Sequence, residues 1–155
     1  MKRATLIAKT TVLILFALRV PALTAVAQIS KTQQQVVKAV RYVWHAKGAN
    51  QQVDAAQALR DIVLATDPIT IDDRTIHTVA SLLVLQNDAT RYWVVEALGH
   101  FGSRARFVSP TLLRILNQRE CMISETSSAP MIRDTLEQIG TPAPDRKCDH
   151  YLLPH

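Results

Sequence analysis

The sequence predicts an all-α fold, and three observations carry this prediction. Apolar residues recur at the three- and four-residue spacing of an amphipathic helix in six segments between residues 31 and 139. Only 4 of the 155 residues are glycine, whereas Ala, Leu, Gln and Arg, which favour helices, are common between the breaks. No stretch alternates apolar and polar residues with the two-residue period of a strand, so we expect no sheet.

The expected helices span residues 31–47, 51–65, 74–86, 89–101, 109–118 and 129–139. Asp67-Pro68 separates the second helix from the third, because the residue before a proline is pushed out of the helical region. Either Asp72 or Asp73 is expected to cap the third helix. Gly102 is expected to end the fourth helix in the left-handed conformation.

The first and fourth helices carry the bulky aromatic side chains. In the first, Val40, Val43 and Trp44 lie on the predicted buried stripe. The fourth is apolar on most sides, which predicts a helix buried in the middle of the fold. Tyr92 and Trp93 within it are interpreted either as core residues or as a recognition platform, with the core reading favoured by their helical spacing.

Residues 1–27 have the layout of a secretory signal peptide, with a basic start and an apolar run at 12–18. Ala25 and Ala27 give the small-x-small pattern that a signal peptidase reads, so the mature chain is expected to begin at Gln28. The alternative is an uncleaved anchor, but the apolar run is too short to span about 30 Å of hydrocarbon. We therefore expect a periplasmic or secreted protein that meets the membrane only during export.

Removing the leader changes the charge balance. The whole chain has 18 Lys and Arg against 13 Asp and Glu, but four of the basic residues and none of the acids lie in residues 1–27. The mature part, residues 28–155, is therefore nearly neutral, which argues against a nucleic-acid partner. Its length is that of one domain.

The two cysteines, Cys121 and Cys148, are expected to form a disulfide in an oxidising compartment. The alternative is a metal site that adds His150 and His155 to them. That spacing matches no standard zinc signature, so we expect no metal and no cofactor.

The chain also contains an internal repeat. Ala97, Leu98 and Phe101 align with residues 58–62 after a shift of 39 positions. Leu98, Phe101 and Gly102 align again with residues 136–140 after a shift of 38. Each unit is a helix that ends in Leu-x-x-(Ile/Phe), and the first two are followed by a second, leucine-rich helix. One pair of helices cannot bury its own apolar face, so stacked pairs are expected.

Residues 88–118, with the Ala97-Leu98-Gly99 triplet and Pro110 followed by leucines, resemble a HEAT repeat. This resemblance implies a short right-handed α-solenoid of HEAT-like helical hairpins over residues 28–140. In that family the small alanine and glycine let neighbouring helices pack closely. Residues 141–155, which follow Gly140, are expected to form an extended tail crosslinked to the domain.

No catalytic constellation is present in the sequence. The five histidines are scattered, and there is no nucleophile elbow, phosphate-binding glycine loop or His-Glu-x-x-His motif. We therefore expect a protein that is not an enzyme, with a hydrolase or lyase using His and Asp as a minor alternative.

The contact residues are predicted in two ways. In HEAT-like folds the second helix of each unit lines the concave face, which implies contacts from Arg74, His77, Arg114 and Gln118. Positive charge is also concentrated locally, at Arg104, Arg106, Arg114 and Arg119. This patch is interpreted either as a solvated face or as a surface for an acidic protein partner.

These observations predict an exported protein-binding module. The most specific hypothesis, drawn by analogy, is an immunity protein that inhibits a secreted cell-wall-degrading toxin, with the 66–73 loop entering the active-site cleft. The alternative is a scaffold or adaptor for an assembly of the cell envelope.

Overall fold

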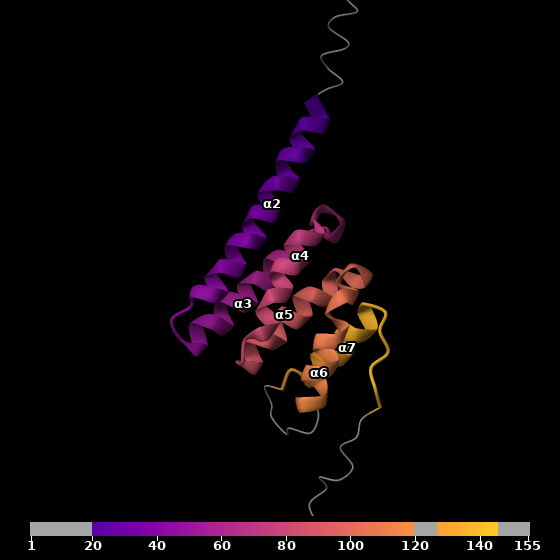
Figure 1. The fold of residues 1–155 in the computed structure, drawn as a ribbon. Coiled ribbons are helices and arrows are strands. Elements are labelled where there is room, and N and C mark those ends of the chain that lie inside the picture. Colours follow the sequence, from indigo (N-terminus) through magenta and orange to yellow (C-terminus); the bar gives the residue numbers. More distant parts are fainter. Residues whose placement is uncertain (1–19, 120–126, 146–155) are drawn as a thin grey trace, which may run out of the picture.

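The structure, a computed structural model, describes the backbone of residues 20–119 and 127–145, and within this part it contains helices and no strand (Figure 1). The predicted all-α class is confirmed. The α-helices are α2 (Val20–His45), α3 (Ala49–Leu64), α4 (Asp73–Ala80), α5 (Asp88–His100), α6 (Ser109–Arg119) and α7 (Ala129–Gln138). Three 3₁₀ helices join them: η1 (Pro68–Thr70), η2 (Ser81–Val84) and η3 (Gly102–Val108).

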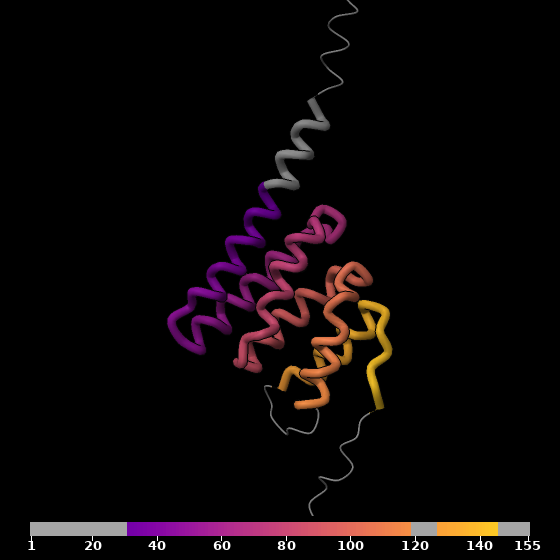
Figure 2. Tube along the Cα trace, in the orientation of Figure 1, coloured from indigo at the N-terminus to yellow at the C-terminus, as the bar shows by residue number. Residues whose placement is uncertain are grey.

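The helices form two rows. In the first row, α5 packs against α3 on one side and against α7 on the other. In the second row, α2 contacts α4 and η2, and η3 contacts both α4 and α6. Figure 2 shows that the chain proceeds from the α2–α3 hairpin at one end of the molecule to α7 and residues 141–145 at the other.

The core lies between the two rows. Leu59, Leu98 and Leu136, which the repeat places in equivalent positions of α3, α5 and α7, are all completely buried. The opposite row contributes Val36, Val40, Ile76, Leu82, Leu112 and Leu116 to the same apolar cluster. Each buried leucine contributes about 1.5–3 kcal/mol relative to an exposed one, so this continuous cluster is the main source of stability.

Hydrogen bonds also join α5 to its neighbours α3 and α7. The Thr135 hydroxyl of α7 donates to the Val95 carbonyl of α5 at 3.1 Å, across 40 residues of sequence. Thr90 of α5 is placed in the same way toward α3, with its hydroxyl 3.5 Å from Gln52 Oε1 and 38 residues away from it. Both threonines are buried, so each bond pairs a polar group that would otherwise be costly to bury.

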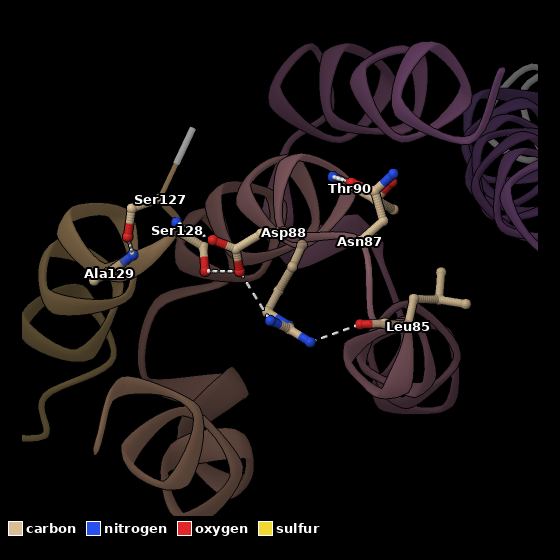
Figure 3. A network of polar contacts seen from close by, with 8 residues as sticks. Leu85, Asn87, Asp88, Thr90, Ser127, Ser128 and Ala129 are labelled. Atoms are coloured by element: carbon tan, nitrogen blue, oxygen red, sulfur yellow. Dashed lines mark hydrogen bonds and ion pairs between the residues drawn. The ribbon is translucent and has the colours of Figure 1, made fainter. Parts of the chain in front are cut away.

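A buried charged network surrounds the start of α5 (Figure 3). The Asp88 carboxylate accepts two hydrogen bonds from Ser128 at the start of α7, from the backbone N–H at 3.0 Å and from the hydroxyl at 2.9 Å. Arg91 Nη1 donates to the same carboxylate at 2.9 Å, and its Nη2 donates to the Leu85 carbonyl at 2.7 Å. The network therefore ties α5 to α7 and to the segment that leaves η2.

Several helix ends follow the predicted signals. Asp72 caps α4, because its carboxylate accepts a hydrogen bond from the Thr75 N–H at 2.7 Å. Asn87, for which no cap was predicted, caps α5 in the same way, accepting from the Thr90 N–H at 3.1 Å. Gly102 has a φ of 56°, in the left-handed region that favours glycine, as predicted for the end of the fourth helix.

Close packing of α5 and α7 depends on Gly99. A Cβ atom at this position would lie 3.1 Å from the Thr135 hydroxyl and would collide with the side-chain amide of Gln138. The expectation that a small residue in this triplet permits close helix packing is therefore confirmed at Gly99.

Three local predictions were wrong. Trp44 is 43% exposed, because Val36, Val40 and Val43 take the core face of α2 and Trp44 lies about 100° away from Val43. The third expected helix stops at Ala80 and continues as η2. The connection after Gly102 was not expected to be helical, but it forms η3.

Two further predictions stay predictions. Helix α2 runs through Ala25, Ala27 and Gln28, where signal cleavage is expected, and this backbone course does not test the cleavage. Cys121 and Cys148 lie outside the described residues, as do His150 and His155. Within the described segments, no helix combines the length and the apolar character needed to cross a membrane.

Candidate functional site

The segment between α3 and α4, residues 66–73, folds as a compact loop around η1. The Asp67 carboxylate accepts a hydrogen bond from the Ile69 N–H at 3.1 Å. The Thr70 hydroxyl donates to the Asp67 carbonyl at 2.7 Å. Ile71 is buried in the core and anchors the end of the loop. These local bonds give the loop a defined shape.

Side chains from three other elements hold the backbone of this loop. His100 at the end of α5 donates from Nε2 to the Thr66 carbonyl at 2.9 Å, which requires the proton on that nitrogen. Arg104 of η3 donates from Nη1 to the Pro68 carbonyl at 2.8 Å. Gln33 of α2 donates to the Thr70 carbonyl at 3.3 Å. The loop is therefore fixed from both rows of helices.

The tip of the fixed loop carries an apolar side chain. Ile69 is 80% exposed, the highest value among the exposed large apolar residues of the described segments. Exposing an isoleucine on a loop held by so many bonds has no benefit for the fold, since burial would be favourable. An exposed apolar residue in a fixed position can serve as an anchor that enters a pocket of a binding partner.

An ion pair lies beside the loop. Arg104 contacts Asp73, the first residue of α4, from Nη2 at 2.5 Å and from Nε at 3.2 Å, both to Oδ1. The Asp73 side chain is 74% exposed, so this pair contributes little to global stability. Its effect is local, because the same guanidinium also holds the Pro68 carbonyl.

Two rings stack on the surface next to this ion pair. The His77 ring of α4 and the Phe107 ring of η3 lie 3.8 Å apart between centroids and are nearly parallel, at 4°. His77 Nδ1 donates to the Asp73 carbonyl at 2.8 Å, which fixes the orientation of its ring. Both residues are exposed, so parts of both rings remain in contact with solvent.

The carboxylate that begins α4 is also stabilised. Hydrogen bonds from the Thr75 hydroxyl and backbone N–H lower the pKa of Asp72, and the charges of Arg74 and Arg104 act in the same direction. Asp72 is therefore ionised at neutral pH and keeps the first turn of α4 in place. We call Ile69, Asp73, His77, Arg104 and Phe107 the loop–α4 surface.

The structure brings some of the predicted contact residues together. His77 and Arg104 both bond to Asp73, and Arg74 lies exposed on the same helix α4. Arg114 and Gln118 are exposed on α6, and no bond joins them to the loop–α4 surface. Their role in partner binding stays a prediction.

The arginines of the predicted positive patch have different environments. Arg104 is paired with Asp73, and Arg106 donates to the Ile139 carbonyl at 3.2 Å beside Gly140. Arg114 is exposed, and the side chain of Arg119 lies outside the described part of the chain. Two of the four positive groups thus have intramolecular partners.

Tyr92 and Trp93 lie between the two interpretations left open by the sequence. Both are half-buried, and their rings meet edge to face at 4.9 Å. Trp93 packs against the core, and the Arg60 guanidinium lies 4.5 Å from the centroid of its ring. Arg60 also pairs with Glu96 at 3.1 Å, so this cluster joins α3 to α5.

The sequence did not identify Phe107 as a surface residue, because it lies in a segment expected to be a plain connection. The signal available was an aromatic residue directly after Arg106, within residues 102–108, where no helix was expected. Within residues 20–119 and 127–145, no group of three or more His, Cys, Asp or Glu side chains could hold a metal ion.

Comparisons with protein-family models, with curated proteins and with solved structures find no match for this chain.

Proposed function

We propose that this protein is an exported, non-enzymatic module that binds another protein through the loop–α4 surface. The observation that carries the proposal is Ile69, an exposed apolar residue on a loop held by hydrogen bonds from α2, α5 and η3. A group that is already ordered loses little conformational entropy on binding. Phe107 and Arg104 add side chains of the types that are enriched at protein interfaces.

We further propose that the two rows of helices form a short right-handed HEAT-like solenoid. Three observations support this arrangement: the successive packing of α3, α5 and α7, the equivalent burial of Leu59, Leu98 and Leu136, and inter-unit bonds that span 38 and 40 residues. In such a solenoid α4 and α6 belong to the row that lines the concave face, which is where proteins of this architecture bind their partners.

The most specific form of the proposal is an immunity protein in the periplasm that blocks a secreted cell-wall-degrading toxin. The shape of the loop supports this form, because a fixed protruding apolar residue can enter an active-site cleft. The leader predicted at residues 1–27 supports the location, and the near-neutral charge of the remaining chain is compatible with a protein partner.

The test is affinity capture with the full-length protein, expressed in its own host and washed at high salt. Ile69→Asp places a charge at the centre of the proposed contact and is expected to abolish capture of a partner retained by the unchanged protein. Val84→Asp is the matched control, because Val84 is also an exposed apolar residue and lies on η2, beyond the far end of α4.

The identity of the retained partner then separates the hypotheses. A secreted hydrolase that loses activity on binding supports the immunity role, and components of an envelope assembly support an adaptor. Equal capture by the Ile69→Asp and Val84→Asp variants would show that the loop–α4 surface is not the contact.

A further inference from the structure

A long groove runs along the α2–α3 hairpin, on the side turned away from α4 and α5. Its volume is ≈ 920 Å³. One side is lined by residues between Gln35 and Lys47, on α2 and in the turn that follows it. The other side is lined by residues between Gln51 and Ile62 on α3. Among the described residues, the α2–α3 hairpin that lines the groove stands at one end of the helical stack (Figure 1).

The groove combines small side chains with an exposed aromatic one. Its lining includes the alanines at positions 39, 46, 55 and 58, which leave room for close approach of another helix. Tyr42 stands at its edge and is 61% exposed, with the Lys38 ammonium 5.8 Å from the centroid of its ring. One face of the hairpin therefore holds both a protruding ring and a recess floored by alanine.

The two walls of the groove carry opposite charges. Lys38 lies on α2 and Lys47 lies in the turn after it, and residues 31–47 contain no acidic residue. Asp54 is the only charged residue that lines the groove from α3. Arg60, the basic residue of α3, is turned toward α5, where it pairs with Glu96. A basic wall thus faces an acidic wall across a weakly polar floor.

A surface with all of these features is complementary to itself. A two-fold axis parallel to the helices places α2 of one copy over α3 of the other, so the basic wall of each meets the acidic wall of its mate. The same operation sets each Tyr42 over the alanines of the opposite groove. An unrelated protein would have to supply this complementary pattern independently, whereas a second copy contains it already.

We propose that the α2–α3 groove is the interface of a two-fold symmetric homodimer of this protein. The contact leaves the loop–α4 surface free, since the groove lies on the opposite side of the hairpin from α4. The proposal does not depend on the proposed function. The dimer contact would also cover the outer face of the α2–α3 hairpin, and the terminal units of stacked helices need such a cap.

The test uses sedimentation equilibrium of the protein expressed from its full sequence and purified in the form that the cell retains. The unchanged protein is expected to be dimeric at about 100 µM. In the proposed dimer, Lys38 of each copy meets Asp54 of the other, so either Lys38→Glu or Asp54→Lys places like charges at both of these contacts. Each variant is expected to weaken the dimer at least about tenfold. Asp134→Lys, at an exposed position of α7, is the control and is expected to leave the dimer unchanged.

Mixing the two charge variants provides the decisive measurement. In a two-fold interface, Glu at position 38 of one chain meets Lys at position 54 of the other, and Asp54 of the first meets Lys38 of the second. The mixture is therefore expected to form a heterodimer, and the double variant Lys38→Glu/Asp54→Lys is expected to recover the homodimer.

Folding is checked by circular dichroism, because all of these positions are exposed and the variants are expected to keep the helical spectrum. A protein that is monomeric at about 100 µM overturns the proposal. A dimer that tolerates both single charge variants also overturns it, since the interface would then lie elsewhere.

Discussion

Two Arg–Asp pairs in this protein use the same chemistry in different surroundings. Arg91 and Asp88 lie in the first turn of α5, with side chains that are 5% and 20% exposed. Arg104 and Asp73 lie on the surface, with side chains that are 34% and 74% exposed. Each arginine also holds a backbone carbonyl, Leu85 in the first case and Pro68 in the second.

The difference in exposure indicates that one pair controls the stability of the domain and the other controls the position of a loop. A buried charge without its partner is costly, so the inner pair is tied to the stability of the whole domain. Water screens an exposed pair, so the outer one adds little global stability but holds a loop in position. Replacing the arginine should therefore destabilise the whole domain in one case and free the 66–73 loop in the other.

The largest effect is expected from Arg91→Ala. This change leaves Asp88 without its guanidinium partner and the Leu85 carbonyl without its donor, and is expected to destabilise the protein by about 3–5 kcal/mol. Urea unfolding followed by circular dichroism measures this. Arg41→Ala, on an exposed part of α2, is the control and should change stability by less than about 0.5 kcal/mol. A loss below about 1 kcal/mol for Arg91→Ala would remove the contrast between the two pairs.

The second largest loss of stability is expected from a larger side chain at the contact between α5 and α7. Gly99→Leu forces a side chain into space occupied by Thr135 and Gln138, and should cost about 1–3 kcal/mol in thermal or urea unfolding. Gly48→Ser is the matched control, because a Cβ at Gly48 meets nothing within 4 Å. If both glycine variants were equally stable, α5 and α7 would not be closely packed.

A smaller effect is expected from Asp72→Ala, which removes the cap of α4 at a cost of about 1 kcal/mol at neutral pH. The pKa of Asp72 is lowered in the folded state, so its contribution is complete above the unfolded pKa of about 3.9 and is lost as the pH falls through the lower folded value. The stability difference between the two proteins should therefore shrink below about pH 4. A difference that persists unchanged in acid would contradict the role of the carboxylate.

The smallest effect on stability is expected from Arg104→Ala, at about 0–1 kcal/mol. Its main consequence should be local, because the Pro68 carbonyl and the Asp73 carboxylate both lose their donor. Amide hydrogen exchange within residues 67–73 should accelerate while exchange in α5 stays unchanged. Unchanged exchange in the loop would show that His100 and Gln33 suffice to hold it.

Much of the helical framework could be predicted from local signals. Apolar periodicity located every α-helix of the described segments, and the ends marked by Asp72 and Gly102 were expected from the sequence. These signals work because capping and left-handed turns depend on a few neighbouring residues. The loop at 66–73 was identified from Asp67-Pro68, but its three distant hydrogen bonds could not be.

The candidate site was predictable only in part. His77 and Arg104 were named from the sequence, yet their shared contact with Asp73 joins residues 31 positions apart. Phe107 was missed because η3 is a 3₁₀ helix without an apolar stripe. Arg91 gave no local sign of burial, since an arginine within a helix is ordinarily expected at the surface.

The sequence by itself determined where the helices form, where most of them end and which leucines repeat, because these depend on contacts between residues close along the chain. Only the tertiary structure decided that Arg91 is buried, that the 66–73 loop is held rigidly, and that one face of α2 and α3 remains open. Those outcomes depend on which helices lie beside one another, and that arrangement sets which polar groups find a partner and which apolar groups remain in water.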